Sequence, residues 1–93
     1  MSDTMKLLHP EEKQGATIRV DKYEVIKDEI LKIVKQNGEI AYKELTNVVK
    51  ENLAETFEGS ITWYVTAVKL DLEARGILER FKSGGLQHLK LVD

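Results

Sequence analysis

The stretch SITWYVTAVKLDLEARGILERFKSGGLQHLKLV, residues 60–92, decides the predicted fold of this 93-residue chain. It opens with Ser60, a residue type that favours helix N-caps because its hydroxyl accepts a hydrogen bond from a free backbone N–H. Gly76 is expected to end the helix. Apolar residues between these two positions recur every three or four residues, which is typical of one buried helix face. They are Ile61, Val65, Val68 and Leu72.

A β-hairpin is predicted after this helix. Residues 77–82 and 86–92 have the composition of two strands, and Ser83-Gly84-Gly85 separates them. Paired glycines tolerate the positive φ angles that tight hairpin turns require. The last third of the chain is therefore expected to be a helix followed by two antiparallel strands.

Two shorter helices are predicted earlier in the chain. The first begins with Asp21 as its N-cap and closes at Asn37-Gly38. The second runs from about Tyr42 to Leu53. Between them, residues 39–41 are expected to form a short strand or an extended piece that places Ile40 in the core. The apolar faces of the two helices are Tyr23, Ile26, Ile30, Ile33 and Val34, and Leu45, Val48, Val49 and Leu53.

This order of elements predicts an α+β fold of the winged helix-turn-helix type, with three helices followed by a two-stranded β wing. Residues 21–93 form the predicted domain, and residues 1–20 form an N-terminal extension. Within the extension, residues 5–8 and 16–20 have the length of strands, and the turn formers His9-Pro10 and Gly15 lie between them. The extension is therefore either a β-hairpin or a loose arm that serves a dimer.

The segment from Ser60 to Arg80 also resembles a known family. Its tryptophan, the run Val-Lys-Leu-Asp-Leu-Glu-Ala at residues 68–74, and the following basic residue and glycine resemble a family of small, uncharacterised bacterial winged-helix proteins. His9-Pro10 and residues 19–23 are similar to that family as well. The resemblance implies a winged-helix fold but no established activity. Residues 72–80 are also similar to the helix-to-wing junction of winged-helix transcription regulators.

The third helix of such a fold enters the major groove of DNA, so duplex DNA is the first predicted partner, in a regulatory setting. Lysine binds phosphate or guanine, and threonine contacts phosphate or the thymine methyl group. In this interpretation Lys69 points to solvent beside Thr62 and Thr66, and the wing holds the DNA backbone. The predicted contact residues are Thr62, Trp63, Thr66, Lys69, Arg80, Lys82, His88 and Lys90.

The charge distribution favours a second interpretation, a protein–protein interaction module without DNA binding. The net charge is −2, whereas dedicated DNA binders are usually basic, at least locally. Residues 38–59 contain two lysines and five glutamates, which suits a basic partner, and residues 77–93 are the one segment with a positive sum. Trp63 is either an exposed anchor for a partner or, as we expect, packed under the N-terminal hairpin. A homodimer, formed by strand addition at residues 16–20 or at the wing, stays open.

No residue pattern predicts an enzyme, a cofactor, a metal site or a small-molecule substrate. The chain has no cysteine, which excludes disulfides, zinc ribbons and thiol catalysis and fits a cytoplasmic protein. Its two histidines, His9 and His88, lie far apart in sequence. No apolar run approaches the roughly 20 residues of a membrane span, and residues 1–20 do not have the pattern of a signal peptide.

Overall fold

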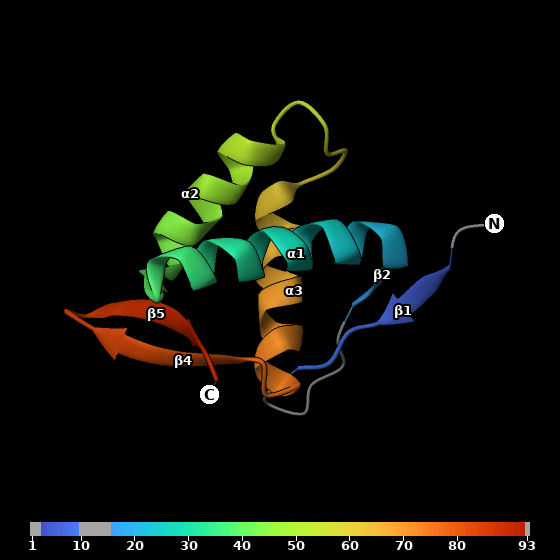
Figure 1. Cartoon of the computed structure of the whole chain (residues 1–93). Coiled ribbons are helices and arrows are strands. Elements are labelled where there is room, and N and C mark those ends of the chain that lie inside the picture. Colours follow the sequence, from blue (N-terminus) through green and yellow to red (C-terminus); the bar gives the residue numbers. More distant parts are fainter. Residues whose placement is uncertain (1–2, 10–15, 93) are drawn as a thin grey trace.

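The computed structural model describes residues 3–9 and 16–92, and in these residues three helices and two small antiparallel sheets surround one core (Figure 1). The predicted mixed α+β class is therefore confirmed. The two sheets lie on opposite sides of helix α3 (Figure 1). The elements, in chain order, are β1 (Thr4–Lys6), β2 (Thr17–Arg19), α1 (Val20–Asn37), β3 (Glu39–Ala41), α2 (Tyr42–Leu53), α3 (Ile61–Ala74), β4 (Leu78–Ser83) and β5 (Leu86–Leu91).

The layout of the strands differs from the predicted two-stranded wing that follows three helices. Strand β3, which lies between α1 and α2, pairs antiparallel with β5, so the sheet order is β3-β5-β4. An extended segment at residues 39–41 was expected, but the sequence pattern did not show that it would pair with β5. The pairing places Ile40 opposite Leu89, and both side chains are buried. Strand β3 thereby satisfies backbone groups that would otherwise be unpaired at the free edge of β5.

The core consists of the apolar helix faces that the sequence predicts. Ile26, Ile30 and Val34 of α1 are fully buried, and their neighbours in the core come from α2, α3 and the β4–β5 hairpin. The further fully buried members are Leu45, Val49, Val65, Val68, Leu72 and Leu89. Among the described residues, no helix combines the length and apolar composition that a membrane crossing requires.

The N-terminal extension contributes a hairpin that shares this core. Strands β1 and β2 are antiparallel, with Met5 opposite Ile18. Leu7 and Ile18 are buried in the same cluster as the helices. The predicted turn formers Pro10 and Gly15 lie outside the described residues. The β-hairpin alternative for this segment is thus correct in its described part.

The element boundaries are mostly the predicted ones, with one error at the start of α1. Ser60 caps α3 by accepting a 3.3 Å hydrogen bond from the Trp63 backbone N–H. Helix α1 has Arg19 as its N-cap residue, and Asp21 is already inside the helix. The Asp21 carboxylate lies 2.7 Å from the Arg19 guanidinium, which lowers the pKa of Asp21, so this carboxylate forms an ion pair instead of the predicted cap.

Candidate interaction face of helix α3

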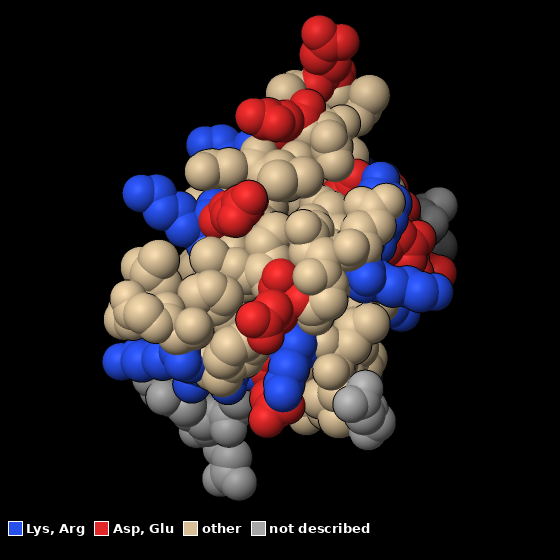
Figure 2. Space-filling view, turned by 60° about the vertical axis from the view of Figure 1, so that its left-hand side comes forward, with Lys and Arg blue, Asp and Glu red and all other residues tan. Residues whose placement is uncertain are grey.

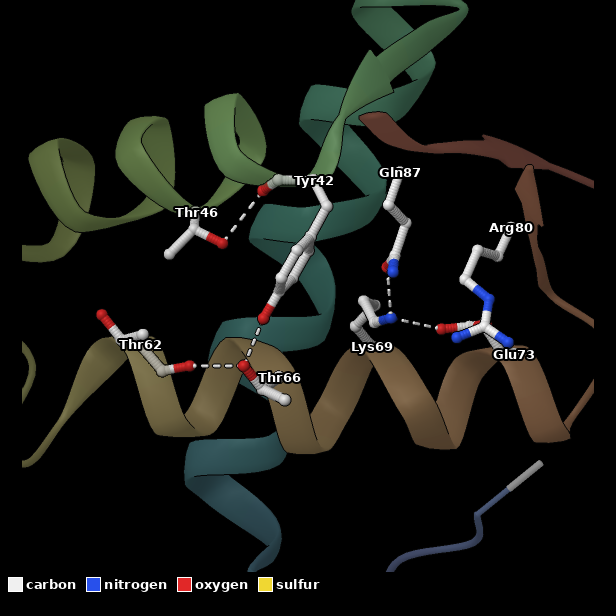
Figure 3. Close-up of polar contacts among 8 residues, drawn as sticks. All are labelled: Tyr42, Thr46, Thr62, Thr66, Lys69, Glu73, Arg80 and Gln87. Atoms are coloured by element: carbon white, nitrogen blue, oxygen red, sulfur yellow. Dashed lines mark hydrogen bonds and ion pairs between the residues drawn. The ribbon is translucent and has the colours of Figure 1, made fainter. Parts of the chain in front are cut away.

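Lys69 is buried, and the expectation that it points to solvent is wrong. Its side chain is 4% exposed, and its ammonium lies 2.7 Å from Glu73 Oε2 (Figure 3). The same ammonium donates a 2.7 Å hydrogen bond to Gln87 Oε1, and it lies 4.8 Å from the centroid of the Tyr42 ring. A lysine ammonium has three N–H donors. Because a carboxylate, an amide oxygen and an aromatic face surround it, Lys69 is not available to a phosphate or a base.

The position of Lys69 on α3 explains this error. Successive residues of an α-helix are about 100° apart, so Lys69 lies at the border of the face that its neighbour Val68 buries, and not opposite that face. The β4–β5 hairpin covers this border, because Gln87 of β5 reaches Lys69. A helical wheel of α3 alone does not show which border this hairpin covers.

Glu73 links α3 to the β4–β5 hairpin. Its side chain is 7% exposed, and Oε1 lies 3.6 Å from Nε of Arg80 on β4 (Figure 3). Lys69, Glu73 and Arg80 therefore form a chain of alternating charges between the helix and the hairpin. Arg80 stays 47% exposed at the outer end of this chain.

The two predicted threonine contacts are in different environments. The Thr66 hydroxyl is hydrogen-bonded to the Tyr42 hydroxyl, and it also donates a 3.0 Å bond to the Thr62 carbonyl (Figure 3). Thr66 is half-buried, and its hydroxyl is engaged within the protein. Thr62 is exposed at the first turn of α3.

The β4–β5 hairpin does not gather its predicted contact residues on one face. Successive residues of a strand point to opposite sides of a sheet. Arg80 is opposite the buried Leu89, and Lys82 lies two residues further along β4, so these two share the core side of the hairpin. His88 is opposite Phe81 and lies two residues before Lys90, so His88 and Lys90 belong to the other side.

The surface around these residues has mixed charge. Lys90 lies 3.7 Å from Glu79, and Arg80 is close to Glu73. On the side of the molecule that comes forward in Figure 2, basic and acidic side chains are interspersed, and apart from the grey residues they form no continuous basic area. A surface that neutralises several phosphates needs several cations without acidic neighbours, and this surface does not group its cations in that way.

A buried carboxylate that the sequence did not single out joins three segments of the chain. Asp71 of α3 is 0% exposed, and it accepts hydrogen bonds from the Tyr23 hydroxyl (2.6 Å), the Leu8 backbone N–H (2.8 Å) and Arg75 Nε (2.8 Å). Burial and the bond to Asp71 raise the pKa of Tyr23, and the hydrogen bond to Asp71 raises the pKa of Arg75. The four-residue spacing of Asp71 and Arg75 is the one signal of this cluster in the sequence.

Trp63 dominates the outward side of α3. It is 47% exposed. The expectation that the N-terminal hairpin segment buries Trp63 is therefore wrong, and the segment lies beside this side chain instead. Leu8 from that segment is 46% exposed, and between the two lies a cavity of about 180 Å³. We call the residues that line this cavity the Trp63 face: Leu7, Leu8, His9, Ala16, Trp63, Thr66, Ala67 and Leu70.

Aromatic contacts hold the tryptophan at the edge of this face. The ring of Trp63 lies edge-on to Tyr64 at 5.0 Å between centroids, and Tyr64 makes a similar contact with Phe57. Within residues 3–9 and 16–92, no three His, Asp or Glu side chains cluster as metal ligands would. The described residues of the Trp63 face are mostly apolar.

Comparison with known proteins agrees with the expectation of an uncharacterised family. No curated protein and no solved structure matches the chain. One family model matches residues 4–88, which is most of the sequence. The chain therefore belongs to the family of unknown function DUF6958.

Proposed function

We propose that this chain is a winged-helix protein that acts as a protein–protein interaction module through the Trp63 face. The scaffold is supported by the element order α1-β3-α2-α3-β4-β5 and by the β3-β5-β4 sheet, in which β4 and β5 form the wing. In this assignment α3 has the position of a DNA-reading helix, and its exposed side chains decide what it binds.

The absence of an exposed cation on α3 is the observation that carries the proposal. Among residues 61–74 the one basic residue is Lys69, and it is buried against Glu73 and Gln87. The outward side instead carries Trp63, Ala67 and Leu70. Base readout in the major groove depends on hydrogen-bonding side chains such as arginine, lysine, asparagine and glutamine, and the affinity for duplex depends on phosphate neutralisation.

The N-terminal segment also limits access to α3. The Leu8 backbone N–H is bonded to Asp71, and Leu7 is buried beside α3, so the chain runs along the outward side of this helix. A recognition helix enters a groove about 12 Å wide with its outward side free. Trp63 and Leu8 are themselves about half exposed, so a partner can contact them without displacing this segment.

The exposed residues of the Trp63 face are of the type that anchors protein interfaces. Tryptophan is enriched among the residues that carry most of the binding energy, and such residues are surrounded by apolar contacts that exclude water. Trp63 and Leu8 border one cavity, and among the residues that the structure describes its lining contains no Asp, Glu, Lys or Arg. This composition fits an apolar protein surface as the partner.

Site-specific photo-crosslinking tests the proposal. A benzophenone amino acid replaces Leu8, which keeps this position apolar, and a control replaces Val25 of α1, which is 45% exposed. We expect protein adducts from position 8 and few from position 25 when the chain is irradiated in its native cells. Adducts to nucleic acid at position 8 in place of protein adducts would overturn the proposal.

Duplex DNA binding through the wing is the second candidate function. It is favoured by Lys82, which is exposed and has no ion pair within the described residues, and by Arg80 on the same side of the hairpin. Anisotropy of a labelled random duplex at about 50 mM salt tests it, since non-specific affinity is strongest when salt is low. Binding that Lys82→Glu weakens and that Leu86→Glu, also in the wing, weakens less would support this candidate. The interaction module predicts no binding.

A further inference from the structure

We infer that the outer edge of strand β4 binds an acidic, extended segment of a partner protein, which adds to the β3-β5-β4 sheet as a fourth strand. The cavity beside this edge and the cavity of the Trp63 face share no described lining residue, so the inference goes beyond the proposed function. Three features of β4 carry it: its unpaired backbone groups, the charge beside them, and the alternation of its side chains.

The outer edge of β4 carries backbone groups that no described strand pairs with. Strand β4 is the last in the sheet order β3-β5-β4. The Val92 N–H donates a 3.0 Å hydrogen bond to the Ile77 carbonyl, and hydrogen-bonded pairs alternate along an antiparallel ladder. The backbone groups of Phe81 therefore face β5, and those of Arg80 and Lys82 face outward. Each of these two residues offers one N–H donor and one carbonyl acceptor to a further strand.

The described residues leave this part of the edge accessible. In Figure 1 the β4–β5 hairpin extends past the helices, on the side of the molecule opposite β1 and β2. Arg80 and Lys82 are both exposed. An added strand can therefore approach β4 without displacing a described element.

The side chains beside the edge select a negative partner. Lys82 has no ion pair within the described residues, and Arg80 contacts Glu73 through Nε, 3.6 Å away (Figure 3). Glu73 is itself buried against the Lys69 ammonium at 2.7 Å, so the two exposed cations are left in excess on this side. Oε1 of Gln87 accepts a hydrogen bond from Lys69, which leaves the Gln87 amide N–H groups as donors. A cavity of about 330 Å³ is lined by Arg80, Phe81, Lys82 and Gln87, and its polar side chains thus present the donors that a carboxylate accepts.

The other side of β4 favours an apolar residue. Side chains alternate between the two sides of a strand, so Phe81 points away from Arg80 and Lys82. The Phe81 ring is 5.5 Å from the His88 ring and 5.6 Å from the Lys90 ammonium. Lys90 in turn lies 3.7 Å from Glu79. This side therefore has no cation without an acidic neighbour among the described residues, and the partner segment is expected to read acidic, apolar, acidic along three successive positions.

Two other occupants fit the edge less well. A second copy that paired through the same strand would place Arg80 and Lys82 beside the same two cations, and like charges directly opposite are unfavourable. A DNA phosphodiester accepts hydrogen bonds but donates none, so it cannot pair with the outward carbonyls of these residues. A peptide strand supplies donors, acceptors and carboxylates together.

Titration with a synthetic peptide tests the inference. The peptide is acetyl-Thr-Val-Glu-Val-Glu-Val-Thr-amide, and its control has lysine at both glutamate positions. NMR-detected amide exchange reports on the edge, because the Arg80 and Lys82 N–H groups gain a partner only in the complex. We expect their exchange to slow about tenfold when the glutamate peptide is at about ten times its dissociation constant. Exchange at Phe81, which is already bonded to β5, should change little, and the lysine peptide should have no effect.

A pair of N-methylated peptides distinguishes strand addition from simple charge attraction. In the added strand, the glutamates opposite Arg80 and Lys82 donate their own N–H groups to β4, whereas the N–H of the valine between them points away. N-methylation of the first glutamate should therefore raise the dissociation constant about tenfold, and N-methylation of that valine should leave it nearly unchanged. Equal dissociation constants for the two methylated peptides would overturn strand addition.

A matched pair of protein variants locates the charge contact. Lys82→Glu reverses a cation at the edge, and Lys50→Glu makes the same change at an exposed position of α2. We expect Lys82→Glu to weaken peptide binding about tenfold or more and Lys50→Glu to leave it unchanged. Far-UV circular dichroism verifies that both variants are folded.

Two results would overturn the inference. One is unchanged exchange at Arg80 and Lys82 with about 5 mM glutamate peptide, since that bounds the dissociation constant above the millimolar range. The other is Lys82-dependent binding of a random duplex by a protein that does not bind the peptide, which would assign these cations to DNA. Crosslinks from position 8 test the Trp63 face separately, because Lys82 does not line it, so failure of this inference and failure of the proposed function are distinguishable.

Discussion

The Tyr23 hydroxyl of α1 donates a 2.6 Å hydrogen bond to the Asp71 carboxylate of α3, across 48 positions of sequence. Asp71 is 0% exposed, and it also receives the Leu8 N–H and the Arg75 guanidinium. A buried carboxylate is costly unless donors compensate its charge. The cluster therefore ties the N-terminal segment, α1 and α3 to one another, and its stability depends on every donor being present.

Replacement of Tyr23 by phenylalanine should destabilise the fold by about 1–3 kcal/mol, because Asp71 loses a donor while it stays buried. Urea unfolding followed by circular dichroism measures this change. Tyr64→Phe is the control, since the Tyr64 hydroxyl has no hydrogen bond within the described residues. Equal stabilities of the two variants would contradict the role given to Tyr23.

The same hydrogen bond predicts a loss of stability at alkaline pH. Burial and the bond to Asp71 raise the pKa of Tyr23 in the folded state above the ordinary tyrosine value of about 10. Below about pH 10 the phenol is protonated in both states and its contribution is complete. Above about pH 10 the unfolded chain releases the proton more readily, so the free energy of unfolding falls as pH rises. Urea titrations from pH 7 to 11 should show a steeper fall for the wild type than for Tyr23→Phe, and parallel curves would refute this.

Lys69→Met should destabilise the protein by about 3–5 kcal/mol, because it leaves the buried Glu73 without its 2.7 Å partner. The double variant Lys69→Met, Glu73→Leu should recover much of that loss, since apolar side chains replace both charges. Lys90→Met is the control: Lys90 and Glu79 are about half exposed at 3.7 Å, so its cost should be about 0–1 kcal/mol. Urea unfolding of the three variants measures these differences. A double variant that is no more stable than Lys69→Met would argue against the pairing of Lys69 with Glu73.

Gly59→Ala should cost about 1–3 kcal/mol. Gly59 has φ of +111°, which side-chain-bearing residues rarely adopt, and a Cβ there would lie 3.1 Å from the Tyr64 ring. Thermal unfolding of this variant should therefore occur at a lower temperature than that of Glu58→Ala, its exposed neighbour. A melting temperature equal to that of Glu58→Ala would show that the turn adapts.

The helices and the β4–β5 hairpin could be predicted because their signals are local. The apolar spacing of α3, the Ser60 cap and the Gly84-Gly85 turn each depend on residues a few positions apart, and both turn glycines have positive φ, 60° and 81°. The pairing of β3 with β5 joins residues about fifty positions apart, and three residues carry no pattern that specifies a partner. Asp21 was wrongly predicted as the N-cap of α1, because its carboxylate forms an ion pair with the nearby Arg19.

The candidate site was harder to predict, because exposure is a property of the whole fold. Lys69 has the spacing of a boundary residue, and Gln87, which buries it, comes from a different element. Trp63 has the spacing of the outward side of α3, but its degree of exposure depends on where Leu8 lies. A single-helix pattern contains neither relationship.

The position of Leu7, Leu8 and Ile18 has a consequence for attempts to shorten the protein. A truncation that starts at residue 21 removes two buried apolar side chains and leaves the Asp71 carboxylate without its backbone donor. The smallest autonomously folding fragment is therefore expected to retain the chain from Leu7 onward. Limited proteolysis that cleaves ahead of Thr17 should loosen the remaining helices instead of trimming a dispensable tail.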